Sequence, residues 1–340
     1  AWVYLQMLRA GYTACAEFHY LHHQPDGQPY ADPAEMSRRV LAAAQRAGMP
    51  LTLLPVLYCR SGFEADIVEP PQRRFRLDAE GYVRLIEDCR LAVDGNSMQK
   101  VGMAPHSLRA VPGELIRELA QLTGGGQPVH IHIAEQRQEV EDCLRHTGAR
   151  PVQWLLQKVS VDDSWCLVHA THMTPEECAA AASSGAVAGL CPTTEADLGD
   201  GFFELDQWIS RAGAFGIGSD SNTRLSVGEE LRLLEYEQRL KNQRRNVLAK
   251  YPVSAAETLY TAASEAGAQA LGHSVGSLVP GARADLVELD SSHPLLDGLR
   301  SNEVMDAWVF AGGEDMIRSV WTAGQRVCLL YTSDAADELT

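Results

Sequence analysis

Short apolar segments alternate with amphipathic segments along most of the chain, and this alternation constrains the fold more than any other feature. The apolar segments are rich in β-branched residues and predict buried strands at residues 13–20, 50–58, 100–104, 128–133, 166–169, 186–191 and 214–220. Between them, apolar positions recur at helical spacing, which predicts helices at 3–10, 34–47, 78–94, 113–122, 136–146, 151–158, from 174 onward, 226–242 and 254–269. This order predicts an α/β fold built on a parallel sheet.

The number of strands bears on whether the sheet closes. Eight strand–helix units close a (β/α)8 barrel of roughly 250 residues, whereas this chain of 340 residues shows only the strands given above. Its first residues, Ala1 to Tyr4, fall inside a predicted helix that no strand precedes. We therefore expect residues 1–272 to form a (β/α)8 barrel that lacks its first strand, in a chain truncated at its start.

The last part of the chain has a different pattern. A turn and a strand are predicted within residues 275–290, and further alternating strands at 306–310 and 317–322. These segments predict a small β domain over residues 273–327. Residues 328–340 show no periodicity, so they stay unassigned, and we expect them to be extraneous to the natural gene.

Composition narrows the class of protein. A hydrophobic fraction of 45% supports a large core, and a net charge of −16 argues against binding nucleic acid or anionic membranes through a basic surface. The eight cysteines are scattered and form no CxxC pair, which predicts buried free thiols. The sequence shows no signal peptide and no apolar run of membrane-spanning length. We expect a cytoplasmic enzyme that acts on a small molecule; the oligomeric state stays open, with a homodimer as one expectation.

Chemistry is concentrated where predicted strands end. His132 and Glu135 stand at the end of the strand at 128–133, where a histidine and a carboxylate can bind a metal and move a proton at one place. His130 lies on the same strand face as His132, and such a pair can equally be a polar lining or a pair of satisfied core groups.

Two later strands end in comparable groups, His169 and Asp220. An aspartate after Gly-Ser can also cap a helix or form a turn, and His172, just beyond His169, is expected to be structural. In a β/α barrel, however, the C-terminal ends of all strands lie on one face, where the catalytic groups sit. His132, His169 and Asp220 together therefore predict a hydrolytic metal site.

These strand-end residues, together with the sequence GSLVPGARADLVELD at 276–290, resemble the amidohydrolase superfamily of metal-dependent hydrolases and deaminases. Within it, the segments FHYLHH, MAPHSLRAV, HIHIAEQ and CLVHATHM resemble the formimidoylglutamate deiminases, enzymes of histidine breakdown. The resemblance covers residues 2–327. The family's HxH metal pair has no counterpart in this chain, and neither has the first half of its small β-sandwich, so residues 273–327 are expected to be a remnant of that sandwich.

The resemblance implies hydrolysis of N-formimidoyl-L-glutamate to N-formyl-L-glutamate and ammonia. It implies one divalent metal, usually zinc, held by the HxH pair, His132 and Asp220. Asp220 would accept a proton from the metal-activated water, Glu135 would carry a proton to the leaving nitrogen, and His169 would orient the nucleophile. A role for His169 as a second metal ligand stays open.

Three further residues are predicted to bind the substrate. His106 and Arg109 follow the strand at 100–104, where a guanidinium could bind a carboxylate through two hydrogen bonds, and Tyr20 ends the first predicted strand. A surface position is the commoner fate of an arginine. In the long loop after residue 58, more arginines could help to cover an anionic ligand, namely Arg60, Arg73 and Arg74. Histidines near Tyr20 are not assigned to the metal and are expected to be polar loop groups, namely His19, His22 and His23.

Two other functions stay open. One is another deaminase of the superfamily that acts on a purine, pyrimidine or triazine ring; such a ring needs stacking walls, whereas a glutamate derivative needs cations, and Arg109 favours the latter. The other is an inactive fragment that only binds ligands or partners. Because two of the four expected metal ligands lie outside this sequence, we expect the 340-residue chain itself to bind metal poorly and to be inactive.

Overall fold

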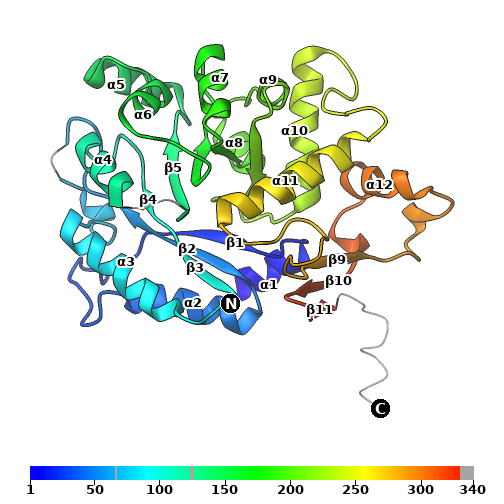
Figure 1. Ribbon diagram of the computed structural model, residues 1–340, viewed down its shortest axis with the longest axis horizontal. Coiled ribbons are helices and arrows are strands. Elements are labelled where there is room, and N and C mark those ends of the chain that lie inside the picture. The colour runs from blue at the N-terminus through cyan, green and yellow to red at the C-terminus, as the bar shows by residue number, and fades with distance from the viewer. Residues whose placement is uncertain (66, 123–125, 330–340) are drawn as a thin grey trace.

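The computed structural model describes residues 1–65, 67–122 and 126–329. A series of short parallel strands runs through it in chain order (Figure 1). β1 pairs with β2, β2 pairs with both β3 and β4, and β5 to β8 pair in sequence. The strands are β1 (Cys15–His19), β2 (Leu51–Leu57), β3 (Gln99–Val101), β4 (Ala104–Pro105), β5 (Val129–Ile133), β6 (Trp165–His169), β7 (Val187–Leu190) and β8 (Ala214–Ile217).

β3 and β4 are two halves of one interrupted strand. Gly102 and Met103 separate them, and Met103 forms a parallel bridge with Val129 that links the two sheets. A Cβ atom at Gly102 would lie 2.6 Å from Leu54 Cδ2 and 2.6 Å from the Pro128 carbonyl oxygen, so only glycine allows this close approach. The strands therefore occupy seven positions, which are the seven that the sequence predicts.

Closure of the array into a barrel is not shown by the pairing. β1 and β8 are not hydrogen-bonded to each other within the described residues. The helix α11 (Ala255–Leu271) packs against β7 and β8, and its last turn accepts hydrogen bonds from the sheet. Thr52 Oγ1 donates to the Leu271 carbonyl at 2.7 Å, and His130 Nε2 donates to the Ala270 carbonyl at 2.8 Å. The (β/α)8 barrel lacking its first strand therefore stays a prediction.

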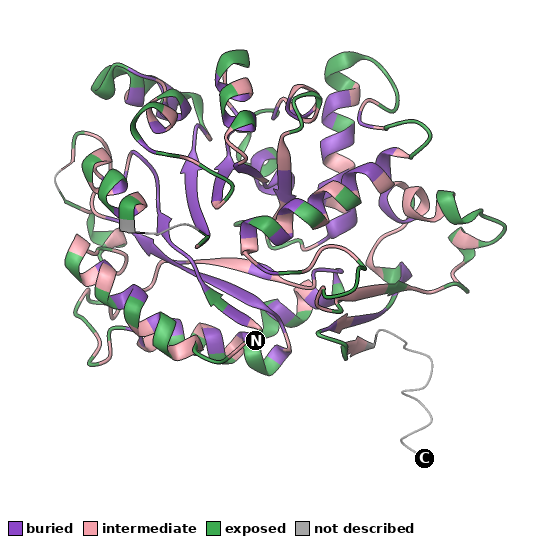
Figure 2. Ribbon diagram, in the orientation of Figure 1, coloured by how far each residue is buried: buried purple, intermediate pink, exposed green. Residues whose placement is uncertain are grey.

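Helices connect the strands and present their polar faces outward, whereas the strands are largely buried (Figure 2). β2, β5 and β6 have no exposed residue, as expected for strands covered on both faces. All helices predicted for the barrel are present close to their predicted bounds: α1 (Trp2–Arg9), α2 (Glu35–Ala47), α3 (Ala79–Val93), α4 (Gly113–Leu122), α5 (Arg137–Thr147), α6 (Pro151–Lys158), α7 (Pro175–Ser183), α10 (Val227–Asn242) and α11. Two short helices were not predicted, α8 (Pro192–Leu198) and α9 (Leu205–Ser210).

After α11 the chain forms a three-stranded antiparallel sheet in the order β11-β10-β9. Its strands are β9 (Leu286–Leu289), β10 (Ile317–Thr322) and β11 (Gln325–Leu329), and α1 packs against β10 and β11. β11 was not predicted, and residues 330–340 of the unassigned tail lie outside the described part of the chain. A complete β-sandwich is not shown by these three strands.

The strand predicted at 306–310 is wrong, because these residues form the helix α12 (Val304–Phe310). α12 packs against α10 and α11, burying Trp308 and Val309, and Asp306 accepts a hydrogen bond from the Ala256 amide at 3.1 Å. The periodicity of a short apolar run fits a helix as well as a strand, and here the packing against α10 and α11 selected the helix. Short 3-10 turns complete the described structure at Pro70–Gln72, Pro294–Leu296, Ser301–Glu303 and Glu314–Met316.

Two expectations from composition are met. All eight cysteines are free, and those in strands and helices are mostly buried. Among the described residues, no helix is long and apolar enough to cross a membrane.

Candidate metal and catalytic site

The predicted site residues lie at the C-terminal ends of the parallel strands, and therefore at one edge of the array. His132 is in β5, His169 is the last residue of β6, and Asp220 follows β8. Backbone φ is positive at His169 (66°) and at Asp220 (50°), a conformation that is uncommon for residues other than glycine. Strained backbone of this kind is concentrated at functional sites.

His132 is hydrogen-bonded through one ring nitrogen. Its Nδ1 donates to the carbonyl oxygen of His106 at 3.2 Å, which leaves the lone pair of the ring on Nε2. Its ring stacks on that of His106 with centroids 4.8 Å apart. Burial, followed by the neighbouring His106 and His169, lowers the pKa of His132 well below its usual value, which keeps the ring neutral.

His169 is held between two carboxylates. It is 1% exposed, its Nδ1 lies 3.0 Å from Glu195 Oε1, and its Nε2 lies 3.8 Å from Glu135 Oε1. Its ring centroid is 5.6 Å from that of His132. Burial alone would lower the pKa of His169, but the bond to Glu195 and the charges of Glu195, Glu135 and Asp220 raise it above the usual value.

Glu195 is the site residue that the sequence analysis missed. It lies in α8, is 1% exposed, and its Oε1 also accepts the Cys191 amide at 2.9 Å. Its position offered one signal, since it follows the end of the predicted strand at 186–191 by four residues. His169, Cys191 and Glu195 have possible ligand atoms within 4.8 Å of one another. Because the Glu195 oxygen already accepts two hydrogen bonds, we interpret the group as a hydrogen-bonded cluster.

Besides Glu195, two predicted acids act on His169, namely Glu135 and Asp220. Glu135 is half-buried, and burial raises the pKa of its carboxyl above the usual value, with Asp200 and Asp220 adding to the rise and His169 opposing it. Asp220 is exposed, and its carboxylate makes no hydrogen bond or ion pair with the residues that the structure describes. Its charge nevertheless reaches His169, which places it beside the same site.

Two of the predicted substrate residues, Tyr20 and His106, belong to a cluster of aromatic rings next to His132. The centroid of the Tyr20 ring is 5.7 Å from that of His106, and the Tyr58 ring lies 4.8 Å from His106. His106 Nδ1 is 2.8 Å from Ser107 Oγ, and burial together with the charge of Arg109 lowers the pKa of His106 to about 3. His106 is therefore neutral, so it can donate a hydrogen bond to a ligand but offers it no positive charge.

Arg109 is half-buried beside this cluster. In the described part of the chain its guanidinium forms no ion pair, although its charge lowers the pKa values of Glu135 and Tyr20 relative to burial alone. A cation without a carboxylate partner, next to acids and neutral histidines, is suited to bind an anionic ligand.

The expectation that the histidines near Tyr20 are polar loop groups near solvent is wrong for two of them, because His19 is the last residue of β1 and both His19 and His22 are only 4% exposed. Several other residues considered in the sequence contact the backbone. Arg60, Arg73 and Arg74 each donate to carbonyl oxygens, Arg73 to Pro25 at 2.8 Å and Arg74 to His23 at 3.0 Å. His22 Nε2 lies 2.8 Å from the Val56 carbonyl, and His172 Nε2 lies 2.8 Å from the Asp200 carbonyl, a structural contact.

Comparison with known proteins places this arrangement among hydrolases. The model of the amidohydrolase family matches residues 3–327. A formimidoylglutamate deiminase of Pseudomonas aeruginosa is 50% identical over 327 residues, which cover 96% of this chain and 72% of that protein. A 5-methylthioadenosine/S-adenosylhomocysteine deaminase of Natronomonas pharaonis is 27% identical over 75% of this chain and 57% of its own length.

Solved structures agree on the fold. The crystal structure of an amidohydrolase from Brucella melitensis has a TM-score of 0.90 and 48% identity, covering 95% of this chain and 71% of that one. An adenosine deaminase from Xanthomonas campestris, crystallised with bound zinc, has a TM-score of 0.77 and 24% identity over 98% of this chain and 70% of its own.

Proposed function

The chain belongs to the amidohydrolase family, and from this premise we propose that it hydrolyses N-formimidoyl-L-glutamate to N-formyl-L-glutamate and ammonia. The similarity to the Pseudomonas deiminase supports this substrate. The structural observation that carries the proposal is that the Arg109 guanidinium makes no ion pair with the described residues, while its charge acts on both His106 and Glu135. A substrate carboxylate supplies the partner that Arg109 lacks, whereas an aminopurine or triazine ring offers no such charge.

We propose that the site takes one divalent metal, zinc, although among the described residues His132, His169 and Asp220 do not all have ligand atoms within 4.8 Å of one another. Nε2 of His132 and the carboxylate of Asp220 would hold it, and the bond from His132 Nδ1 to a carbonyl is the orienting contact that metal-binding histidines require. When bound, zinc supplies an activated water whose pKa is lowered to near 7.

Different side chains of this protein would then carry out the separate proton transfers of the reaction. The water oxygen adds to the amidine carbon, the bond from that carbon to the terminal nitrogen breaks, and the nitrogen leaves as ammonia. Asp220 accepts the water proton, and Glu135, whose pKa is raised, carries a proton to the leaving nitrogen. His169 stabilises the tetrahedral carbon through Nε2, because Nδ1 is committed to Glu195.

We further propose the domain division on which this site depends. Residues 1–272 would form the (β/α)8-type catalytic domain, whose strand ends carry the site, and residues 273–327 the small β domain. The end of α11 at Leu271, with Gly272 at φ 66°, is consistent with a boundary there.

A turnover assay tests the proposed function. Zinc-loaded protein is offered N-formimidoyl-L-glutamate and, separately, a panel of aminopurines and aminopyrimidines, while ammonia release is followed. We expect release from the formimidoyl compound alone. Higher kcat/KM with a ring substrate would overturn the proposal. Saturable binding of N-formyl-L-glutamate without ammonia from any substrate would also overturn it and would identify the chain as a binding protein.

A further inference from the structure

The segment after β2 is joined to the segment that carries Arg109. The amides of Cys59 and Arg60 both donate to the Ala110 carbonyl, at 3.0 and 3.1 Å. The loop from residue 59 to residue 77 therefore starts in direct contact with the backbone next to the predicted substrate residues.

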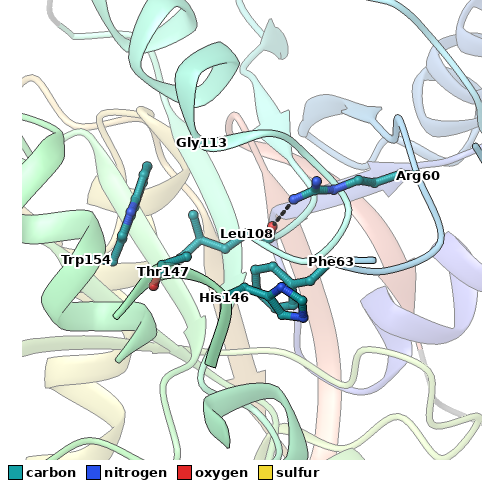
Figure 3. A pocket seen from close by; sticks show the side chains of 7 residues that line it. All are labelled: Arg60, Phe63, Leu108, Gly113, His146, Thr147 and Trp154. Atoms are coloured by element: carbon teal, nitrogen blue, oxygen red, sulfur yellow. Dashed lines mark hydrogen bonds between the residues drawn. The ribbon is translucent and has the colours of Figure 1, made fainter. Parts of the chain in front are cut away.

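The Arg60 side chain extends this contact to two successive carbonyls. Its Nε donates to the carbonyl oxygen of Arg109 at 3.1 Å. Its Nη2 donates to the carbonyl oxygen of Leu108 at 3.3 Å, the bond drawn as a dashed line in Figure 3. These two carbonyls belong to the peptide planes on either side of the Arg109 Cα. Since each peptide is planar, fixing both planes fixes φ and ψ at Arg109 and so the direction of its Cα–Cβ bond.

The Arg60 guanidinium is in turn supported from the side. It lies 5.8 Å from the centroid of the Phe63 ring, and Phe63 stacks on His146 with centroids 5.3 Å apart and an interplanar angle of 9°. Figure 3 shows these side chains around a cavity of about 220 Å³, which Leu108 and Trp154 also line. The cavity leaves room for water, so a shortened side chain at position 60 would not force the core to collapse.

We propose that Arg60 is a positioning residue for substrate recognition, which aims the Arg109 guanidinium by holding the Leu108 and Arg109 carbonyls. This inference rests on the proposed function, in which Arg109 binds the substrate carboxylate. In this role the loop that begins at residue 59 does not cover the ligand. The Arg60 side chain acts on Arg109 and makes no contact with the ligand.

Binding of N-formyl-L-glutamate by zinc-loaded protein tests the proposal, measured by isothermal titration calorimetry. Losing both carbonyl contacts in Arg60→Ala should weaken binding about 10-fold, since each is a neutral-acceptor hydrogen bond of modest net strength. Arg60→Lys should restore little of this loss, because lysine keeps the charge but lacks the planar guanidinium whose separate nitrogens reach the two carbonyls. Arg84→Ala is the control, since Arg84 is an exposed arginine of α3 that pairs with Glu80, and it should leave binding unchanged.

The decisive measurement is a double-mutant cycle. In an Arg109→Ala background, Arg60→Ala should have no further effect on affinity, because it acts through Arg109. Additive losses, or full affinity in Arg60→Lys, would show that Arg60 attracts the ligand directly and would overturn the inference. If Arg109→Ala alone binds normally, the carboxylate-binding role in the proposed function fails instead. Bound zinc and thermal unfolding, expected to match the parent protein, exclude misfolding as the cause.

Discussion

Removing the Glu195 carboxylate should loosen the segment that holds His169. Glu195 Oε1 accepts hydrogen bonds from His169 Nδ1 at 3.0 Å and from the Cys191 amide at 2.9 Å, and all three residues are buried. Glu195→Ala leaves two buried donors without an acceptor. At about 1–3 kcal/mol for each unsatisfied donor, the local structure should lose roughly 2–6 kcal/mol.

The variant Glu195→Gln distinguishes the effect of the carboxylate charge from the effect of the hydrogen bonds. The amide oxygen can still accept hydrogen bonds, so the loss for each of the two bonds is only the difference between a charged and a neutral bond, about 1–1.5 kcal/mol, or roughly 2–3 kcal/mol in all. The free-energy loss in the glutamine variant should therefore lie at the lower end of the range for the alanine variant.

Amide hydrogen exchange, followed by mass spectrometry, measures the loss of local stability around Glu195. In peptides spanning β7 and α8, protection of the Cys191 amide should fall about 5- to 10-fold in Glu195→Gln and at least about 30-fold in Glu195→Ala. Glu176→Gln, at the exposed start of α7, serves as the control and should leave exchange in these peptides unchanged. Parent-like protection in Glu195→Ala would refute the reasoning, because the two bonds would then contribute nothing.

Three other predictions follow from the site. Arg109→Ala should weaken N-formyl-L-glutamate binding by about 2–5 kcal/mol while bound zinc stays constant, as judged by calorimetry and elemental analysis; unchanged affinity would remove Arg109 from the site. His132→Ala should lower the zinc retained after dialysis against a weak chelator, and equal retention would remove His132 as a ligand. Burial raises the pKa of Glu139 from 4.5 to about 7, so the folded state binds this proton more tightly than the unfolded state. Stability should fall as pH rises from about 4.5 to about 7, by about 3 kcal/mol at most, and Glu139→Gln should flatten urea-unfolding midpoints over this range; an unchanged pH dependence would contradict the raised pKa.

Much of the secondary structure could be predicted from the sequence, because strands and helices leave patterns among residues close together in the chain. The buried strands β2, β5 and β6 are short and mostly apolar, although histidines alternate with apolar residues in β5. The helices have caps such as Ser226 and Ser254, whose side chains accept amide hydrogen bonds. The failure at α12 shows the limit: seven residues are too few to separate a helical from an extended period, and the contacts with α10 and α11 made the choice.

The chain by itself also determined where chemistry would collect, because parallel strands put their C-terminal ends on one edge and His132, His169 and Asp220 each stand at such an end. Only the tertiary structure decided what surrounds these groups. Glu195 reaches His169 across 26 residues and Arg60 reaches the Arg109 carbonyl across 49, and no local periodicity encodes such a pairing. Hydrogen bonds between distant residues depend on how the elements pack, so they become visible only once the chain is folded.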